Sequence, residues 1–232
     1  MDFWTNIFSE IPGNSVLELA CGTGRLAYGL VREGAEYTGL ELSSNFSDLA
    51  KKKLNGVGLP VSIVEGNMCN FQLNKTFDLI FIGFNSFLHL LNDDDAISCL
   101  DCVKKHMNKK TRFLIDIFTP NPLFLYRPKG ARFNVLEYTD SKSDEKIIVD
   151  ESNKYNSDTE INEMTWNFSS ENKKDFAKEF FSMRMYFPSK MNQILIDCGF
   201  KILHQWGDYY RSNLGEGSKL QIYDTCLAWN AK

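Results

Sequence analysis

The sequence lacks the features that place a protein in or across a membrane. It has no signal peptide and no apolar run long enough to cross a bilayer. It also lacks an excess of positive charge, because 30 acidic side chains outnumber 26 lysines and arginines and give a formal net charge of −4. This balance argues against a nucleic-acid partner, which would favour a basic face. We therefore expect a cytoplasmic protein with no membrane partner.

Cysteine spacings that would define a metal site are also scarce. Among the six cysteines only Cys99 and Cys102 have C-x-x-C spacing, and no second pair completes a zinc site with them. Both fall in a helical pattern, so reduced thiols are the simpler interpretation. The sequence predicts no metal site, and it contains no internal repeat or low-complexity tract.

The sequence does contain enough apolar residues for a full core. Its 232 residues, 43% of them hydrophobic, fit one α/β domain with a modest addition. The 18 phenylalanines suggest an aromatic-rich pocket or a second layer. Apolar spacing and the positions of glycine and proline predict helices over 2–11, 24–33, 44–55 and 92–107, and strands over 15–20, 36–41, 61–65, 76–84 and 112–118.

The most informative stretch runs from the first of these strands into the helix that follows it. It reads Val16-Leu-Glu-Leu-Ala-Cys-Gly-Thr-Gly-Arg25, an apolar strand followed by a glycine turn. Gly22 and Gly24 let the backbone pass close to a ligand, because no Cβ stands in the way. The first amides of the helix then face that ligand. Dinucleotides and S-adenosylmethionine are the two ligand classes that use such a turn.

Two residues bear on the choice between these classes. The dinucleotide pattern places a third glycine at the position of Ala27, where alanine is often accepted. Glu18 carries more weight, because an acid inside an apolar strand is costly to bury without a partner. The ammonium group of an amino-acid-bearing ligand is one such partner, directly or through water. The stretch from Glu18 to Gly24 closely resembles the first motif of class I S-adenosylmethionine-dependent methyltransferases, and the resemblance runs over nearly the whole chain.

The resemblance implies a site for S-adenosylmethionine, whose product is S-adenosylhomocysteine. Glu41, at the end of the second strand, is expected to accept both ribose hydroxyls. Asn67 stands where relatives usually carry an aspartate that accepts from the adenine amino group, and its amide oxygen is able to accept the same bond. The cofactor-binding residues implied are Glu18, Ala20, Gly22, Gly24, Glu41, Leu42, Asn67, Met68, Gly83 and Phe84.

The stretch after the fourth strand is expected at the reaction centre, because ligands of open α/β sheets bind beyond the carboxyl ends of the strands. Asn85 and Ser86 are predicted to contact the substrate. His89 is the candidate catalytic base. A hydrogen-bonded structural role for His89 is an equally supported alternative.

Between residues 131 and 187 the α/β pattern gives way to extended segments over 132–138, 146–150, 160–168 and 177–187. Polar turns separate them, which predicts an antiparallel sheet of three or four strands. A helix over 188–198 and strands over 200–206 and 220–229 then resemble the closing hairpin of the class. The expected fold is therefore a Rossmann-like sheet of seven strands, the last antiparallel, flanked by helices. Residues 1–127 and 188–232 form the methyltransferase domain, and residues 128–187 form the insert.

The second half resembles a subgroup of small-molecule methyltransferases, similar to the amino-sugar N,N-dimethyltransferases and glycine-type N-methyltransferases. By that resemblance the insert covers the active site, and Trp166, Arg184 and Tyr186 face the substrate; ordinary sheet packing is the alternative. The implied reaction is in-line methyl transfer to an amine nitrogen of a small-molecule acceptor. An O-methyltransferase, an RNA-modifying enzyme on the same fold and a non-enzymatic S-adenosylmethionine-binding protein are the alternatives.

Relatives usually carry a longer segment before the position of Trp4, and that segment closes over the cofactor. A short or absent lid here leaves the site to be covered by the insert alone or by a second subunit. A homodimer is therefore one expectation from the sequence.

Trp166→Ala and Arg184→Ala test whether these two residues face the acceptor. We expect both changes to weaken turnover while S-adenosylmethionine affinity stays nearly unchanged, because the acceptor contacts are separate from the glycine turn. Melting temperature, cofactor affinity and turnover are measured on each variant. Equal loss in all three measurements would identify a core residue, and normal turnover would exclude the residue from the acceptor pocket.

Overall fold

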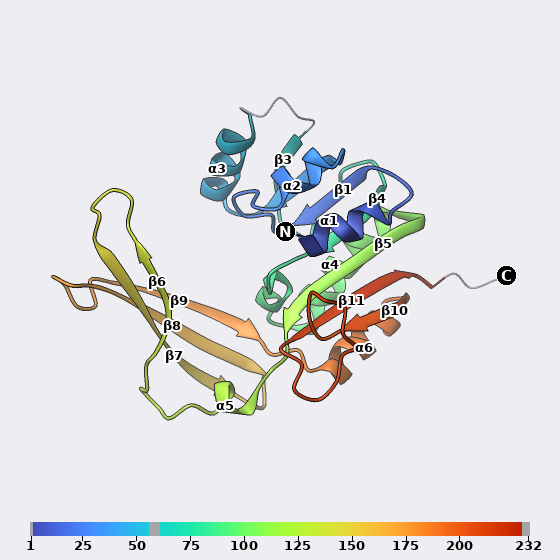
Figure 1. Ribbon diagram of the computed structural model, residues 1–232. Helices are drawn as coiled ribbons and strands as arrows, with labels where there is room; N and C mark the ends of the chain where they lie inside the picture. The colour runs from blue at the N-terminus through green and yellow to red at the C-terminus, as the bar shows by residue number, and fades with distance from the viewer. Residues whose placement is uncertain (1, 56–60, 229–232) are drawn as a thin grey trace. The chain divides into compact units, whose positions relative to one another are not determined.

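The computed structural model describes residues 2–55 and 61–228 and divides the chain into two compact units (Figure 1). The first unit comprises the chain up to Phe87, Asn92–Thr119 and the chain from Phe187 onward. The second comprises Leu88–Leu91 and Pro120–Tyr186. The second unit thus includes residues 120–127, which the sequence pattern assigns to the methyltransferase domain. The reason is that the short helix in this stretch packs against a strand of the second unit.

The first unit alternates helices and strands along the chain. No helix within residues 2–55 and 61–228 is both long enough and apolar enough to cross a membrane. The elements, of which η1 runs on into the second unit, are α1 (Asp2–Ser9), β1 (Ser15–Leu19), α2 (Ala27–Arg32), β2 (Glu36–Glu41), α3 (Ser44–Leu54), β3 (Val61–Glu65), β4 (Phe77–Ile82), the 3-10 turn η1 (Ser86–His89), α4 (Asp93–Lys105), β5 (Met107–Phe118), α6 (Pro188–Asp197), β10 (Phe200–Trp206) and β11 (Leu220–Leu227).

The strands of the first unit form one sheet in the order β10-β11-β5-β4-β1-β2-β3. β1 pairs in parallel with β2 and β4, and β11 runs antiparallel to both of its neighbours, β5 and β10. The predicted sheet of seven strands with an antiparallel last strand is confirmed. The strand order reverses between β1 and β4, so the carboxyl ends of β1, β2 and β4 form the edge where ligands of such sheets bind.

Apolar side chains on both faces of the sheet are buried. On one face, α1, α2 and α3 pack against residues that include Val16, Leu79, Phe81 and Leu114. Trp4 of α1 stacks on Phe81, with ring centroids 4.4 Å apart. The alternate strand residues point to the opposite face, which α4 and α6 cover (Figure 1). Burial on both faces explains why the central strands are apolar throughout.

Several predicted elements differ in length from the observed ones, and for three of them the local reason is clear. The helix expected from residue 24 begins at Ala27, because Gly24 has a φ of +69°. The strand expected to reach residue 84 ends at Ile82, because Phe84 has a φ of +54°. The strand expected from residue 112 begins at Met107, which pairs with Phe77. Residue 229, at the end of the last expected strand, lies outside the described residues.

The second unit is a four-stranded antiparallel sheet in the order β6-β7-β8-β9. This confirms the predicted antiparallel insert. β7 and β8 are longer than expected, because their hairpin stays paired along its whole length. The elements are α5 (Pro122–Leu125), β6 (Phe133–Thr139), β7 (Lys146–Asn156), β8 (Ile161–Ser170) and β9 (Ala177–Arg184).

An ion pair joins the antiparallel strand β11 to β5. Arg112 Nε donates to Asp224 Oδ1 at 2.6 Å, and the guanidinium group also contacts Oδ2. The Asp224 side chain is fully buried, whereas Arg112 is partly exposed. Burial raises the pKa of Asp224, and the hydrogen bond and positive charge of Arg112 oppose that rise.

Arg112→Leu should lower the free energy of unfolding by about 3 kcal/mol, because Asp224 would be left buried without its partner. Arg112→Leu combined with Asp224→Leu should recover most of this loss, since no buried charge remains. Urea unfolding measures the free energy of unfolding of both variants. Lys201→Ala, at an exposed residue of β10, is the control. Equal stability of the single and double variants would mean that the ion pair does not hold β11 in place.

Candidate active site

The turn between β1 and α2 has the backbone that its glycines predict. Gly22 has a φ of +57°, and a Cβ added there would meet no atom within 4 Å. A Cβ added to Gly24 would approach Leu54 Cδ1 to 2.8 Å. Gly22 therefore faces open space, while Gly24 lies against the Leu54 side chain of α3. Ala20 is also left-handed, with a φ of +55°, which is a strained conformation for a residue with a side chain.

Glu41, at the end of β2, holds this turn in place. Its Oε2 accepts a hydrogen bond from the Gly22 amide at 2.7 Å, and its Oε1 accepts one from the Ser43 amide at 2.9 Å. The two residues meet because β1 and β2 are parallel neighbours whose carboxyl ends lie side by side. A carboxylate has about four acceptor positions, so Glu41 keeps acceptor capacity for further donors.

Glu18, in the middle of β1, is 4% exposed. Its partner is Tyr37 of β2, whose hydroxyl donates to Glu18 Oε2. Burial raises the pKa of Glu18 to about 8, although the Tyr37 hydrogen bond and the charge of Arg25 oppose the rise. Burial also raises the pKa of the neighbouring Cys21 thiol to about 12, so Cys21 stays protonated and is a poor nucleophile.

The backbone after β4 is strained in two successive residues. Phe84 and Asn85 have φ values of +54° and +66°. The buried residue Asp116 of β5 holds both, because its Oδ1 accepts from the Phe84 amide at 2.9 Å and its carbonyl accepts from the Asn85 amide at 3.1 Å. The Asn85 side chain in turn accepts from the Phe118 amide at 2.7 Å. Asn85 thus fixes the end of β4 to the end of β5.

Two further side chains complete this cluster. The Tyr209 hydroxyl donates to Asp116 Oδ2. Burial is the main cause that raises the pKa of Asp116, and the Tyr209 hydrogen bond opposes it. The guanidinium group of Arg25, which follows the glycine turn, lies 3.7 Å from the centre of the Phe84 ring. The stack of Arg25 on Phe84 places the glycine turn beside the strained end of β4.

The other predicted site residues of the first unit lie around the same edge of the sheet. Ser86 Oγ donates to the Gly83 carbonyl at 2.8 Å, which closes the turn into η1. Asn67 follows β3 and accepts from the Cys69 amide at 2.8 Å, so its oxygen is already engaged in a local turn. Leu42 is exposed beyond Glu41, and Met68 is half-buried. The assignment of Asn67, Leu42 and Met68 to cofactor binding and of Ser86 to substrate binding stays a prediction.

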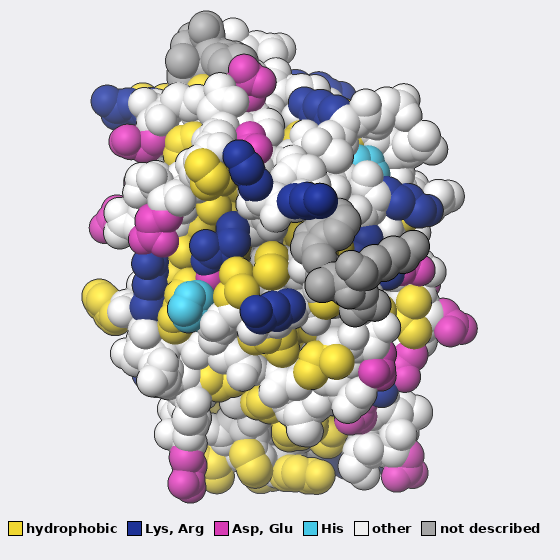
Figure 2. All heavy atoms as spheres, turned by 90° about the vertical axis from the view of Figure 1, so that its right-hand side faces the viewer, with side chains coloured by type: hydrophobic (Ala, Val, Ile, Leu, Met, Phe, Trp, Pro, Cys, Tyr) yellow, Lys and Arg dark blue, Asp and Glu magenta, His cyan; other side chains and the backbone are white. Residues whose placement is uncertain are grey.

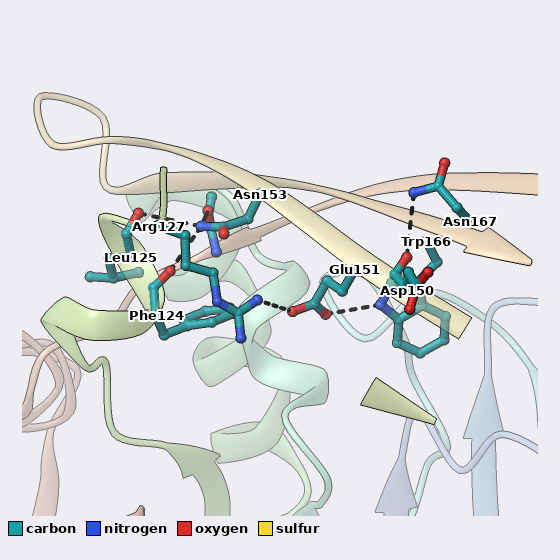
Figure 3. A network of polar contacts seen from close by, with 9 residues as sticks. Phe124, Leu125, Arg127, Asp150, Glu151, Asn153, Trp166 and Asn167 are labelled. Carbon is teal, nitrogen blue, oxygen red and sulfur yellow. Dashed lines mark hydrogen bonds and ion pairs between the residues drawn. The ribbon is translucent and has the colours of Figure 1, made fainter. Parts of the chain in front are cut away.

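The predicted residues of the second unit have partners within that unit. The Trp166 indole Nε1 donates to Glu151 at 2.9 Å, and Arg127 bonds the other oxygen of Glu151 at 2.8 Å (Figure 3). Arg184 is buried and forms an ion pair with Glu160 at 3.0 Å.

The last two predicted residues of the second unit contrast in burial. Tyr186 is fully buried, and its hydroxyl donates to the Leu90 carbonyl at 2.6 Å. His89, one residue before Leu90, is exposed at the end of η1. Contact of Trp166, Arg184 and Tyr186 with the substrate and a catalytic role for His89 stay predictions.

Three residues of the cluster in the first unit were missed by sequence reasoning. Asp116 had the same signal as Glu18, because it is an acid within an apolar strand. Tyr209 and Arg25 gave no such signal, since their partners are distant in the sequence. An acid flanked by apolar residues is therefore the sequence feature that would have found this part of the site.

An open, mostly parallel sheet with an antiparallel last strand, a glycine turn after β1 and an acid at the end of β2 define the fold of class I S-adenosylmethionine-dependent methyltransferases. Residues 16–110 match the family described as a methyltransferase domain. Residues 16–110 are therefore similar to a methyltransferase domain, and the chain has the fold of this class. The matched residues cover β1 to the beginning of β5, which includes the glycine turn and Glu41.

Curated relatives match about half of the chain. The chain is 26% identical over 117 residues to the cypemycin N-terminal methyltransferase of a Streptomyces species. This match covers 50% of this chain and 47% of that protein. It is 28% identical over 119 residues to the putative methyltransferase YqeM of Bacillus subtilis strain 168, and this match covers 50% of this chain and 48% of that protein. The chain thus spans about half the length of the curated relatives it matches.

Solved structures match nearly the whole chain. A S-adenosylmethionine-dependent methyltransferase from Clostridium acetobutylicum ATCC 824 has a TM-score of 0.83 at 21% identity, covering 98% of this chain and 90% of that one. The CcbJ methyltransferase from Streptomyces caelestis has a TM-score of 0.81 at 20% identity, and the match covers 96% of this chain and 87% of that one. The sugar N-methyltransferase KedS8 from Streptoalloteichus sp ATCC 53650 has a TM-score of 0.69 at 16% identity, covering 94% and 83%. At these identities the likeness defines the fold.

The raised pKa of Glu18 predicts a specific loss of stability with increasing pH. Its pKa in the fold, about 8, lies above its ordinary value of 4.5, so the neutral form is the one that suits the fold. This contribution is complete below pH 4.5 and is lost as the pH rises through about 8. Each pKa unit corresponds to about 1.4 kcal/mol, so the loss amounts to a few kcal/mol.

Glu18→Gln should remove this loss, because glutamine stays neutral and its oxygen still accepts from Tyr37. Urea unfolding at pH values across this window compares the wild type with the variant. Glu33→Gln, at an exposed acid beyond α2, is the control. Parallel stability curves for the wild type and Glu18→Gln would mean that Glu18 is ionised in the folded protein throughout the window.

Proposed function

We propose that this protein transfers a methyl group from S-adenosylmethionine to an amine nitrogen of a small molecule. The observation that carries the proposal is the left-handed glycine turn whose Gly22 amide is bonded to Glu41. The turn leaves open space beside Gly22, and the acid retains acceptor positions next to that space. This combination fits a nucleoside whose ribose hydroxyls need an acceptor.

The residues of the first unit fit the parts of the cofactor. Gly22 gives the ligand close access to the backbone, and Glu41 would accept from the two ribose hydroxyls. Glu18 is the candidate partner for the ammonium group of the amino-acid part, directly or through water. Binding of that ammonium would favour the ionised form of Glu18 and release a proton, so cofactor affinity should rise as the pH increases toward about 8.

The chemistry asks mainly for positioning. When bound, S-adenosylmethionine supplies an electrophilic methyl group on a sulfonium. The chain must hold the acceptor nitrogen in line with that methyl group and exclude water. The fixed turn at Phe84 and Asn85 is suited to this task, because Asp116 and Asn85 hold its backbone in one conformation. Exposed His89 remains the candidate base for the amine proton.

An amine acceptor is favoured over other acceptors by the named activities of similar proteins. These include a cypemycin N-terminal methyltransferase, a sugar N-methyltransferase and a glycopeptide N-methyltransferase. A ubiquinone biosynthesis O-methyltransferase of Schizosaccharomyces pombe, 32% identical over 89 residues, keeps an oxygen acceptor as the second candidate. An RNA substrate is disfavoured by the net charge of −4, and the face in Figure 2 mixes acidic, basic and hydrophobic side chains.

Gly22→Val should abolish S-adenosylmethionine binding, because a branched side chain would occupy the open space and disfavour the left-handed turn.

Glu41→Ala should lower the affinity for S-adenosylmethionine at least about tenfold, since each hydrogen bond to a charged group contributes roughly 1.5–3 kcal/mol. Calorimetry measures both variants, and Glu65→Ala, at the exposed end of neighbouring β3, is the control. Unchanged affinity in a folded Gly22→Val protein would exclude this turn as the cofactor site.

A screen of amine, amino-acid and amino-sugar acceptors tests the reaction itself, with S-adenosylhomocysteine formation as the measured product. We expect turnover with at least one amine. Turnover with phenols or carboxylates alone would replace the N-methyltransferase proposal with an O-methyltransferase. S-adenosylmethionine binding with no turnover on any acceptor class would favour a cofactor-binding protein without this activity.

A further inference from the structure

A pocket of about 420 Å³ lies within the first unit. It is lined by the first residues of α1, by the residue after β4 and by the segment after β10, namely Asp2, Phe3, Trp4, Asn6, Phe84, Tyr209 and Tyr210. None of the sequence-predicted acceptor residues of the insert lines it. Phe84 is the one lining residue that the sequence analysis had placed at the cofactor site.

The chemistry of the lining suits a positively charged group. Five of the seven residues are aromatic, and an aromatic ring attracts a cation to its face. Asp2 contributes a carboxylate and Asn6 an amide, and the lining contains no lysine, arginine or histidine. The Phe84 ring already holds one cation in this way, because Arg25 lies 3.7 Å from its centre.

Two walls of the pocket are held by the same buried carboxylate. Asp116 accepts from the Phe84 amide through one oxygen and from the Tyr209 hydroxyl through the other. A third wall is tied to Tyr209, since the rings of Phe3 and Tyr209 lie 5.2 Å apart. The walls are therefore fixed before a ligand arrives, which lowers the ordering cost of binding.

The pocket lies beside the carboxyl end of β4, one of the strand ends that form the edge where ligands of such sheets bind. Phe84 directly follows Gly83 at the end of β4, and a Cβ added to Gly83 would come within 3.5 Å of the Trp4 ring. Arg25, stacked on Phe84, directly follows the glycine turn. Charged groups near the pocket include Asp2 in its lining, Asp116 bonded to Tyr209, Arg25 stacked on Phe84, and Asp208 and Arg211 on either side of Tyr209 and Tyr210 in the chain. Asp2 is the one charged side chain in the lining, and it favours a cation.

We propose that this pocket binds the ammonium group of the methyl acceptor. The proposal rests on the proposed function and deepens it, because it assigns the acceptor's charged end to the first unit rather than to the insert. The acceptor class is then an alkylamine that is protonated in solution. Asp2 supplies the opposite charge, and the rings of Tyr209, Tyr210 and Phe84 supply cation–π contacts.

Tetramethylammonium is a suitable probe, because it carries the charge and cannot accept a methyl group. Trp4 is a sensor within the pocket, since its indole Nε1 is buried and has no hydrogen-bond partner among the described residues. We expect its NMR resonance, assigned with Trp4→Phe, to shift on titration with tetramethylammonium and to stay unchanged with tert-butanol, a neutral molecule of similar shape. An equal response to both molecules would overturn the proposal.

Asp2→Asn and Tyr210→Ala should each weaken tetramethylammonium binding by up to about fivefold, the range that an exposed ion pair and an exposed cation–π contact give. Tyr210 is 93% exposed, so its removal leaves the core intact. The same variants should raise KM for the best amine of the screen while kcat and S-adenosylmethionine affinity stay near wild type. Asp94→Asn, an exposed acid in the first turn of α4, is the matched control.

Two results would contradict the assignment to the acceptor. An equal loss of S-adenosylmethionine affinity in Asp2→Asn and Tyr210→Ala would assign the pocket to the cofactor instead. If both variants behave like the control Asp94→Asn, the pocket binds neither the acceptor nor the cofactor. Failure of the wild type to bind S-adenosylmethionine would overturn the proposed function itself, and the tetramethylammonium titration distinguishes that failure from the failure of the pocket.

Discussion

The site of the first unit depends on one carboxylate, that of Glu41. Its two oxygens accept from the amides of Gly22 and Ser43, so it joins the turn after β1 to the end of β2. Hydrogen bonds to a charged acceptor are roughly twice as strong as neutral ones, which suits a turn that must hold three left-handed residues. The same carboxylate lies within hydrogen-bond distance of the Gly22 backbone, beside which a Cβ would meet open space. One group thus supports the turn and is the proposed acceptor for the ribose hydroxyls.

Asp116 has a comparable role at the ends of β4 and β5. Left-handed residues with side chains cost about 1–3 kcal/mol each, and Phe84 and Asn85 follow one another in that conformation. The hydrogen bonds from their amides to Asp116, and from Phe118 to Asn85, offset that cost. The strain places the Phe84 ring on Arg25 and in the wall of the pocket. A buried acid thus converts an unfavourable backbone into a defined surface.

The second unit contains polar contacts that occupy the residues expected to face a substrate. Glu151 is buried and bridges Arg127 to Trp166 (Figure 3). Arg127 also lies over the rings of Phe124 and Phe133. Breaking such a buried pair is costly, because the remaining charge has no water to replace its partner. Trp166 is therefore part of a structural network whether or not its ring contacts an acceptor. The network provides the buried Glu151 of β7 with a partner for each of its oxygens.

The sequence by itself determined the alternation of helices and strands, the glycine turn and the antiparallel insert, because apolar periodicity and glycine positions are local signals. It also marked Glu18 and Glu41, since an acid in or at the end of an apolar strand is visible in a few residues. Only the tertiary structure decided the partners: Tyr37 for Glu18, and Tyr209 for Asp116, 93 residues away along the chain. Likewise, the pocket joins Asp2 to Tyr210. These pairings depend on which strands become neighbours, and no local pattern encodes a contact between residues so distant in sequence.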